Sequence, residues 1–203
     1  MTGDGTACVT TFQAAVLKAG QRLYTNSGCA SMGYDLPAAI GAWFATRAKR
    51  IICLAGDGSI MMNLQELQTI AGNKLPIKMF VLNNDGYHSI RQTQQSYFPD
   101  NIVGCGPDSG VSFPDFQKVA NAFGIPFRKI ECHSDLDSEI TATLERAGPQ
   151  ICEVILDKDQ VFSPKISSRR LEDGSMVSSP LEDMAPFLPR EELARNMEIA
   201  PDV

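Results

Sequence analysis

The stretch Gly56-Asp57-Gly58-Ser59 decides the fold that we expect for this chain. It follows an apolar run at residues 51–55 (IICLA), which predicts a buried strand ending in a tight turn. A second apolar run at 77–82 (IKMFVL) leads into Asn83-Asn84-Asp85-Gly86. Between the two runs, apolar residues recur at the spacing of one helix face: Ile60, Leu64, Leu67 and Ala71. The order strand, glycine turn, helix, strand predicts a parallel βαβ crossover.

This crossover is expected to bring two polar stretches together. Right-handed connections place the carboxyl ends of both strands on one edge of the sheet, and ligands of open α/β sheets bind at that edge. We therefore expect Asp57 and Asn84 to lie side by side. The carboxylate of Asp57, the amide oxygen of Asn84 and the backbone carbonyl of Gly86 are hard oxygen ligands of the kind that suits Mg²⁺. The sequence thus predicts a metal site at these three residues.

A phosphate site is expected beside the metal. Gly58 and Ser59 open the helix that follows the turn. Free N–H groups and the helix dipole favour an anion at such a position. A metal next to a phosphate site suggests a diphosphate that is held through its cation.

The two stretches together resemble the thiamine diphosphate (ThDP) motif. Asn84 follows Asp57 by 27 positions, and each half of the motif stands at the end of a hydrophobic strand. The resemblance implies the ThDP-binding fold and the cofactors ThDP and Mg²⁺. The cofactor-binding residues that it implies here are Gly56, Asp57, Gly58, Ser59, Asn84, Gly86 and Tyr87. The alternative is an ordinary doubly wound domain whose turns merely look alike.

A second resemblance lies in residues 27–42 (SGCASMGYDLPAAIGA), which are similar to a segment of the acetolactate synthase group of ThDP enzymes. In that group a methionine is a wedge between the two cofactor rings. A backbone carbonyl two residues earlier accepts a hydrogen bond from the aminopyrimidine. By position these roles fall to Met32 and to the carbonyl of Ala30, so both are predicted to bind the cofactor. Without the flanking motif, Met32 would be read as a core methionine.

The segment after Asn84 adds two candidates. In the family this segment passes beside the diphosphate and the thiazolium ring, so the resemblance implies that Tyr87 and His88 line the site. We treat His88, like Met32, as a candidate catalytic residue. The alternative for His88 is a hydrogen-bonded bystander, and a proton-transfer role is the less favoured reading.

The rest of the chain continues the alternation of helix and strand up to residue 156. We expect a helix at about 113–123 with Ser112 as its N-cap, a strand at 126–131, a helix from Ser134 to about Ala147, and a strand at 150–156. The prediction is an α/β fold, doubly wound, with a mainly parallel sheet covered by helices on both faces. Residues 1–20 are expected to be a lead-in or linker remnant, 21–157 the cofactor-binding domain, and 158–203 a proline-rich tail.

Composition limits the classes of function. The chain has 203 residues, a net charge of −6 and 43% hydrophobic residues, as expected of a globular protein with a sizeable core. The acidic balance argues against a nucleic-acid partner. No apolar stretch approaches the roughly 20 residues that span a bilayer, and no signal peptide is apparent. We therefore expect a cytoplasmic protein without a membrane partner.

The resemblance covers nearly the whole chain but only one third of a typical family enzyme. It implies the diphosphate-binding (PP) module of a 2-keto-acid decarboxylase or carboligase, either a lyase or a transferase. The activating glutamate of the family lies on a pyrimidine-binding (PYR) domain, which this sequence lacks. That domain would belong to the same longer polypeptide or to a separate subunit, in a homo- or hetero-oligomer, and this chain alone would be inactive. The alternatives are the small subunit of a split sulfopyruvate- or phosphonopyruvate-type decarboxylase, and a non-catalytic module with the ThDP fold.

Overall fold

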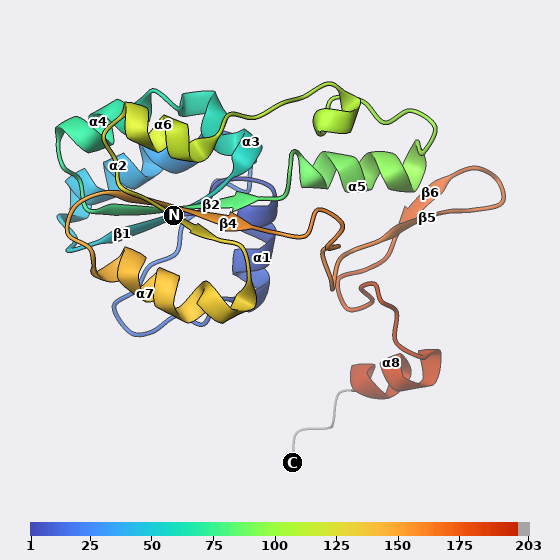
Figure 1. The fold of residues 1–203 in the computed structure, drawn as a ribbon. Coiled ribbons are helices and arrows are strands. Elements are labelled where there is room, and N and C mark those ends of the chain that lie inside the picture. The colour runs from blue at the N-terminus through green and yellow to red at the C-terminus, as the bar shows by residue number, and fades with distance from the viewer. Residues whose placement is uncertain (199–203) are drawn as a thin grey trace, which may run out of the picture. The chain divides into compact units, whose positions relative to one another are not determined.

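A computed structural model describes residues 1–198 (Figure 1), so residues 199–203 of the expected tail lie outside the described part. The chain divides into two compact units, Met1–Gln160 and Val161–Val203, which are described separately.

The first unit is built on a four-stranded parallel sheet with the order β1-β2-β4-β3. The strands are β1 (Ile51–Gly56), β2 (Ile77–Asn83), β3 (Phe127–Ile130) and β4 (Gln150–Ile155). Strands β1 and β2 pair in register from Ile51 with Ile77 to Gly56 with Leu82. The carboxyl ends of β1 and β2 therefore lie next to each other, as the crossover predicted.

Helices cover both faces of this sheet. One face packs against α2 (Asp35–Thr46), α4 (Glu66–Gly72) and α6 (Phe116–Ala122), and the other against α7 (Leu136–Glu145) (Figure 1). The larger core cluster includes Leu36, Leu67, Ile70, Phe116 and the strand residues Met79 and Val81. The smaller cluster surrounds Phe80, Ile130 and Cys152. The predicted α/β fold with a parallel sheet between helices is confirmed.

The segment between β1 and β2 is less regular than its apolar spacing predicted. It begins as α3 (Asp57–Ile60), tightens into η1 (Met61–Asn63) and resumes as α4. Asn63, at the end of the 3-10 turn, donates a hydrogen bond from its side chain to the carbonyl of Gly33 at 2.7 Å. The apolar face is nevertheless buried, because Ile60 and Leu67 are both in the core cluster.

The N-terminal segment packs within the first unit. Thr2 forms a parallel bridge with Leu54 of β1, and the N–H of Gly3 donates to the Leu54 carbonyl at 2.7 Å. Helix α1 (Thr6–Ala14) follows directly. Residues 1–3, at the start of the expected lead-in, thus extend the hydrogen bonding along the outer edge of β1.

Two predicted helix starts differ from the structure. Helix α6 has Asp115 as its N-cap, accepting from the Lys118 N–H, in place of Ser112. Pro114 accounts for the shift, because a proline disfavours helical geometry in the residue before it. Helix α7 is preceded by the 3-10 turn η3 (His133–Asp135), so Ser134 precedes the helix without capping it.

Helix α5 (His88–Tyr97) follows β2 and leads to a loop that contains η2 (Pro107–Ser109). No helix within residues 1–198 has the length and apolarity needed to cross a membrane.

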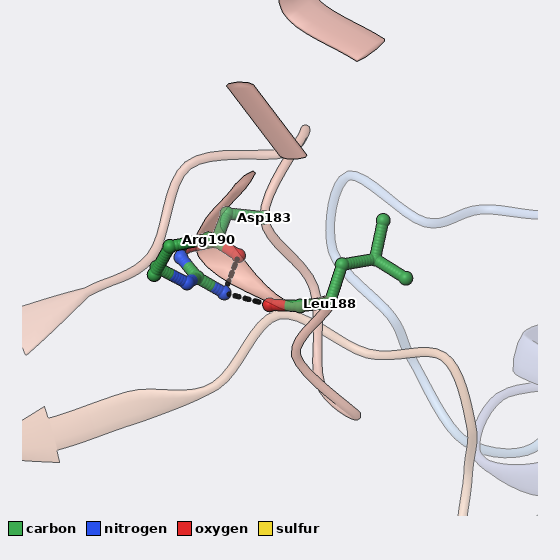
Figure 2. A network of polar contacts seen from close by, with 3 residues as sticks. All are labelled: Asp183, Leu188 and Arg190. Carbon is green, nitrogen blue, oxygen red and sulfur yellow. Dashed lines mark hydrogen bonds and ion pairs between the residues drawn. The ribbon is translucent and has the colours of Figure 1, made fainter. Parts of the chain in front are cut away.

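The second unit contains an antiparallel pair, β5 (Ser168–Arg170) with β6 (Met176–Ser178), and helix α8 (Arg190–Met197). At the start of α8, the Arg190 guanidinium binds both carboxylate oxygens of Asp183, at 2.7 and 2.9 Å, and the Leu188 carbonyl at 2.8 Å (Figure 2). These contacts give local order to the part of the tail that contains them.

Candidate functional site

A cavity of about 100 Å³ lies beside the carboxyl ends of β1 and β2. The N-terminal segment, the loop before α2, the turn after β1 and the start of α5 all contribute to its wall. The residues that line it are Asp4, Gly5, Thr6, Met32, Gly56, Asp57, Gly58, Ser59, Asn84, Gly86, Tyr87, His88, Ser89 and Ile90. Every predicted site residue except Ala30 is in this wall.

Asp57 joins the two halves of the predicted motif. Its side chain is almost fully buried, with 1% of its surface exposed. One carboxylate oxygen accepts the N–H of Gly58 and the other accepts the N–H of Gly86, both at 2.8 Å. The turn at residues 56–59, called the Asp57 turn below, is thereby bound to the turn after β2.

Burial dominates the electrostatics of this carboxyl group. It raises the pKa of Asp57 from 3.8 to about 6, because the charged form loses its hydration. The N–H groups of Gly86 and Gly58 oppose this rise without cancelling it. A buried carboxylate that is short of positive partners is a favourable ligand for a cation entering the cavity.

Asn84 is oriented by its neighbours. Its side-chain nitrogen donates to the hydroxyl of Thr6 at 2.8 Å, and its backbone carbonyl accepts from the Arg91 guanidinium at 3.1 Å. Because Thr6 engages the nitrogen, the amide oxygen is the end of the side chain that remains suited to a metal. Arg91 also donates to the carbonyls of Asp85 and Lys158, so one buried guanidinium holds the backbone of this turn.

At two glycines of the motif, Gly58 and Gly86, close contacts leave no room for a side chain. Gly86 has a φ of +132°, and a Cβ there would meet the Cys105 carbonyl oxygen at 2.1 Å. At Gly58 a Cβ would meet the Tyr87 ring at 2.3 Å. That ring also packs edge-on against Phe113, with ring centroids 5.7 Å apart. Tyr87 therefore fills the space that Gly58 leaves open.

His88 is buried at the start of α5 and lines the cavity. Burial lowers the pKa of His88, and the nearby Arg91 lowers it further. Backbone groups of Lys158 and Gln160 act in the opposite direction on that pKa. The imidazole is therefore favoured in its neutral form.

Met32 and Ala30 differ in their placement. Met32 lines the cavity with 37% of its surface exposed, and Gly33 next to it donates its N–H to the Ser59 hydroxyl at 3.0 Å. Ala30 is exposed, and its φ is +50°. The Ser59 hydroxyl in turn donates to Asp35 at 2.7 Å, so its proton is already used within the protein.

The donor set fits a hard cation such as Mg²⁺. Within residues 1–198, His, Cys, Asp and Glu side chains do not gather in groups of three or more that could hold a metal ion. A metal at Asp57 would therefore need the amide oxygen of Asn84 and the carbonyl of Gly86 beside its single carboxylate. Mg²⁺ accepts such a set because it keeps water and phosphate oxygens in its remaining positions.

Sequence reasoning did not select three residues that shape this site, namely Thr6, Asp35 and Arg91. Thr6 lies 78 positions from Asn84, and no periodic pattern links the two. Asp35 and Arg91 are charged residues with 0% and 9% of their surfaces exposed. Helical spacing could have found Arg91, because the guanidinium reaches back from α5 to the turn before it.

Comparison with known proteins finds a matching family and several relatives. Residues 3–154 match the family described as thiamine pyrophosphate enzyme, C-terminal TPP binding domain. The chain is 38% identical over 143 residues to the acetolactate synthase large subunit of Cyanidium caldarium, covering 70% of this chain and 24% of that protein. It is 35% identical over 138 residues to the isozyme 2 large subunit of Escherichia coli K12, covering 68% and 25%.

The chain spans about a quarter of the length of these relatives. The matched range includes the Asp57 turn, Met32, Asn84 and Gly86, and it ends at residue 154, within β4. The chain therefore belongs to the thiamine pyrophosphate enzyme family, in which it corresponds to the C-terminal TPP-binding domain.

Proposed function

We propose that this chain binds the diphosphate of ThDP through Mg²⁺ in the cavity at Asp57. The observation that carries the proposal is the pair of hydrogen bonds from Gly58 and Gly86 to the buried Asp57 carboxylate. They bring both halves of the motif to one wall of a cavity at the carboxyl edge of the sheet.

Each motif residue has a role in this proposal. Asp57, Asn84 and the carbonyl of Gly86 hold the metal. Gly56, Gly58 and Ser59 form the turn beside which the diphosphate lies, and Tyr87 packs behind that turn. The N–H of Gly58 already donates to Asp57, so its contribution to the site is to orient the carboxylate.

Met32 and His88 face the reactive part of the cofactor in this proposal. Met32 supports the two rings in a bent arrangement, and the carbonyl of Ala30 accepts a hydrogen bond from the aminopyrimidine. Ala30 lies outside the cavity wall of this chain, so its contact requires the rings to extend beyond that wall. His88, being favoured in the neutral state, would bind and orient without adding charge.

The chemistry of the proposed whole enzyme depends on a second domain. Bound ThDP would supply a carbon nucleophile and an electron sink for the cleavage of a small 2-keto acid. We propose that residues 21–157 form most of the PP domain, that the N-terminal segment completes its cavity wall through Asp4, Gly5 and Thr6, and that residues 158–203 form a tail. A PYR domain of the same polypeptide or of another subunit would complete the site in an oligomer. The product formed from pyruvate with that domain present would distinguish ligation from simple decarboxylation.

Calorimetric titration of ThDP into the chain with Mg²⁺ tests the proposal. Asp57→Ala removes the single anionic ligand, so Mg²⁺-dependent binding should be lost while the fold is retained. Asp115→Ala is the matched control, because the Asp115 side chain also accepts a backbone N–H but is exposed, at the N-cap of α6. Equal ThDP affinity in the parent and Asp57→Ala would contradict the metal assignment.

A further inference from the structure

Ser59 and Asp35 connect two segments of the cavity wall that are far apart in the sequence. The Ser59 hydroxyl donates to Asp35 Oδ2 at 2.7 Å and accepts the N–H of Gly33 at 3.0 Å. Asp35 has no exposed surface and Ser59 has 4%. One hydroxyl thus binds the Asp57 turn to the loop at residues 26–33, called the Met32 loop below.

Gly33 is held from two sides by the segment that follows the Asp57 turn. Its N–H reaches Ser59, and its carbonyl accepts from the Asn63 side chain at 2.7 Å. Its φ is +81°, and a Cβ there would meet the Met62 Cβ at 2.6 Å. The residue directly after Met32 therefore has little freedom to move relative to residues 59–63.

Asp35 is itself fixed in place. The Leu36 N–H donates to Asp35 Oδ1 at 2.8 Å, which leaves Oδ2 for the Ser59 hydroxyl. On the far side, a Cβ at Gly3 would lie 2.5 Å from Oδ2, so the N-terminal segment closes the space around the carboxylate. The acceptor that orients the Ser59 hydroxyl is thus immobilised by the first turn of its own helix and by the N-terminal segment.

We propose that Asp35 is a positioning residue that, through the Ser59 hydroxyl, holds Met32 in register with the Asp57 turn. The proposal rests on the proposed function, in which the diphosphate lies at the Asp57 turn and Met32 meets the cofactor rings. Since the Ser59 hydroxyl gives its one proton to Asp35, it cannot also donate to a phosphate. The hydroxyl instead couples the two segments, so that an anion bound at the Asp57 turn changes the environment of the Met32 loop.

Three substitutions disturb this connection from different segments. In Asp35→Asn the Leu36 N–H keeps the amide oxygen at the position of Oδ1, so the amide nitrogen faces Ser59. The Ser59 hydroxyl then has no acceptor for its proton at that position. Ser59→Ala deletes the hydroxyl. Gly3→Ala places a methyl group against Asp35 Oδ2 and leaves both polar partners in place.

A matched control is available on α4. The Thr69 hydroxyl donates to Glu66 at 2.9 Å, which is the same pairing of hydroxyl and carboxylate away from the cavity wall. Thr69→Val and Glu66→Gln should leave the coupling between diphosphate and Met32 intact.

The experiment titrates Mg²⁺ with inorganic pyrophosphate into the full chain carrying ¹³C-methyl methionine. Phosphorus NMR reports binding at the Asp57 turn, and the Met32 methyl resonance, assigned with Met32→Leu, reports the loop. In the parent and the controls both signals should shift with one Kd. In Asp35→Asn and Gly3→Ala pyrophosphate affinity should stay within about threefold of the parent, and in all three variants the Met32 methyl response should be largely lost.

The two readouts separate the possible failures. If the phosphorus signal of the parent does not respond, the proposed function fails, and the positioning role fails with it. If phosphorus responds but Met32 is silent in the parent, or responds fully in the variants, the positioning role alone is overturned. Should Asp35→Asn fail to fold, Ser59→Ala and Gly3→Ala decide the outcome, because neither adds a polar group to the buried space around Asp35.

Discussion

Ionisation of Asp57 should oppose folding of the metal-free chain. Its pKa is raised to about 6 in the folded state from an ordinary 3.8, chiefly by burial. A carboxyl with a raised pKa contributes stability that is fully present below pH 3.8 and is lost as the pH rises through 6. The shift of about 2 units corresponds to about 3 kcal/mol, of which about 2 kcal/mol falls between pH 4.5 and 7.5.

Asp57→Asn isolates this effect from the other titrating groups. The asparagine cannot ionise, and its lost hydrogen bond adds a cost that does not depend on pH. The free energy of unfolding, measured by urea denaturation of both proteins, should therefore diverge with pH. The parent should lose about 2 kcal/mol relative to Asp57→Asn between pH 4.5 and 7.5.

Saturation with Mg²⁺ and ThDP should offset this loss of stability in the parent. At 100 times the Kd, binding to the folded state adds about 2.7 kcal/mol to the parent at pH 7.5, and nothing to Asp57→Asn. A difference in unfolding free energy that stays flat across this pH range would refute the electrostatic reasoning. An equal ligand-induced gain in both proteins would refute the role of Asp57 as a metal ligand.

Four further substitutions separate the site from its scaffold. Gly86→Ala should destabilise the protein by more than about 2 kcal/mol and abolish Mg²⁺-dependent ThDP binding, because the added methyl group collides with the Cys105 carbonyl. Its control is Gly41→Ala, in open space on α2. That substitution should stabilise the protein by about 0.5–1 kcal/mol in urea denaturation. Arg91→Met should lower the free energy of unfolding by about 2–3 kcal/mol, since three backbone carbonyls lose their donor. It should also weaken the ThDP affinity measured by calorimetry at least about tenfold. Unchanged affinity would contradict the role of Arg91 in holding the turn. Lys78→Met, which removes two hydrogen bonds to backbone carbonyls near the end of α7, should cost about 1–3 kcal/mol and leave ThDP affinity unchanged.

The sequence predicted the parts of the fold that depend on local pattern. The apolar runs at 51–55 and 77–82 became β1 and β2. Strand β2 is buried along most of its length, as a continuous hydrophobic run predicts, whereas Ile52 of the edge strand β1 is 41% exposed. The juxtaposition of Asp57 with the Gly86 turn followed from the handedness of the crossover. Both inferences needed only short-range periodicity and a general rule of topology.

The parts that sequence reasoning missed depend on long-range contacts. The Thr6 hydroxyl meets Asn84 because the N-terminal segment pairs along the edge of β1, and no apolar repeat indicates that pairing. Asp35 reads as a first-turn helix acid, yet it is fully buried against Ser59. The start of α6 was misplaced for a local reason, the restriction that Pro114 imposes on the residue before it.

The measurement that most directly tests the central claim is a phosphorus NMR titration of ThDP against the chain, first with Mg²⁺ and then with excess chelator. Phosphorus NMR detects weak binding, which suits a chain that spans about a quarter of its relatives' length. A metal bridge at Asp57, Asn84 and Gly86 predicts diphosphate resonances that shift with added protein and return to the free position on chelation. Shifts that persist after chelation, or resonances that do not move at high protein concentration, would contradict a diphosphate held through Mg²⁺ at this site.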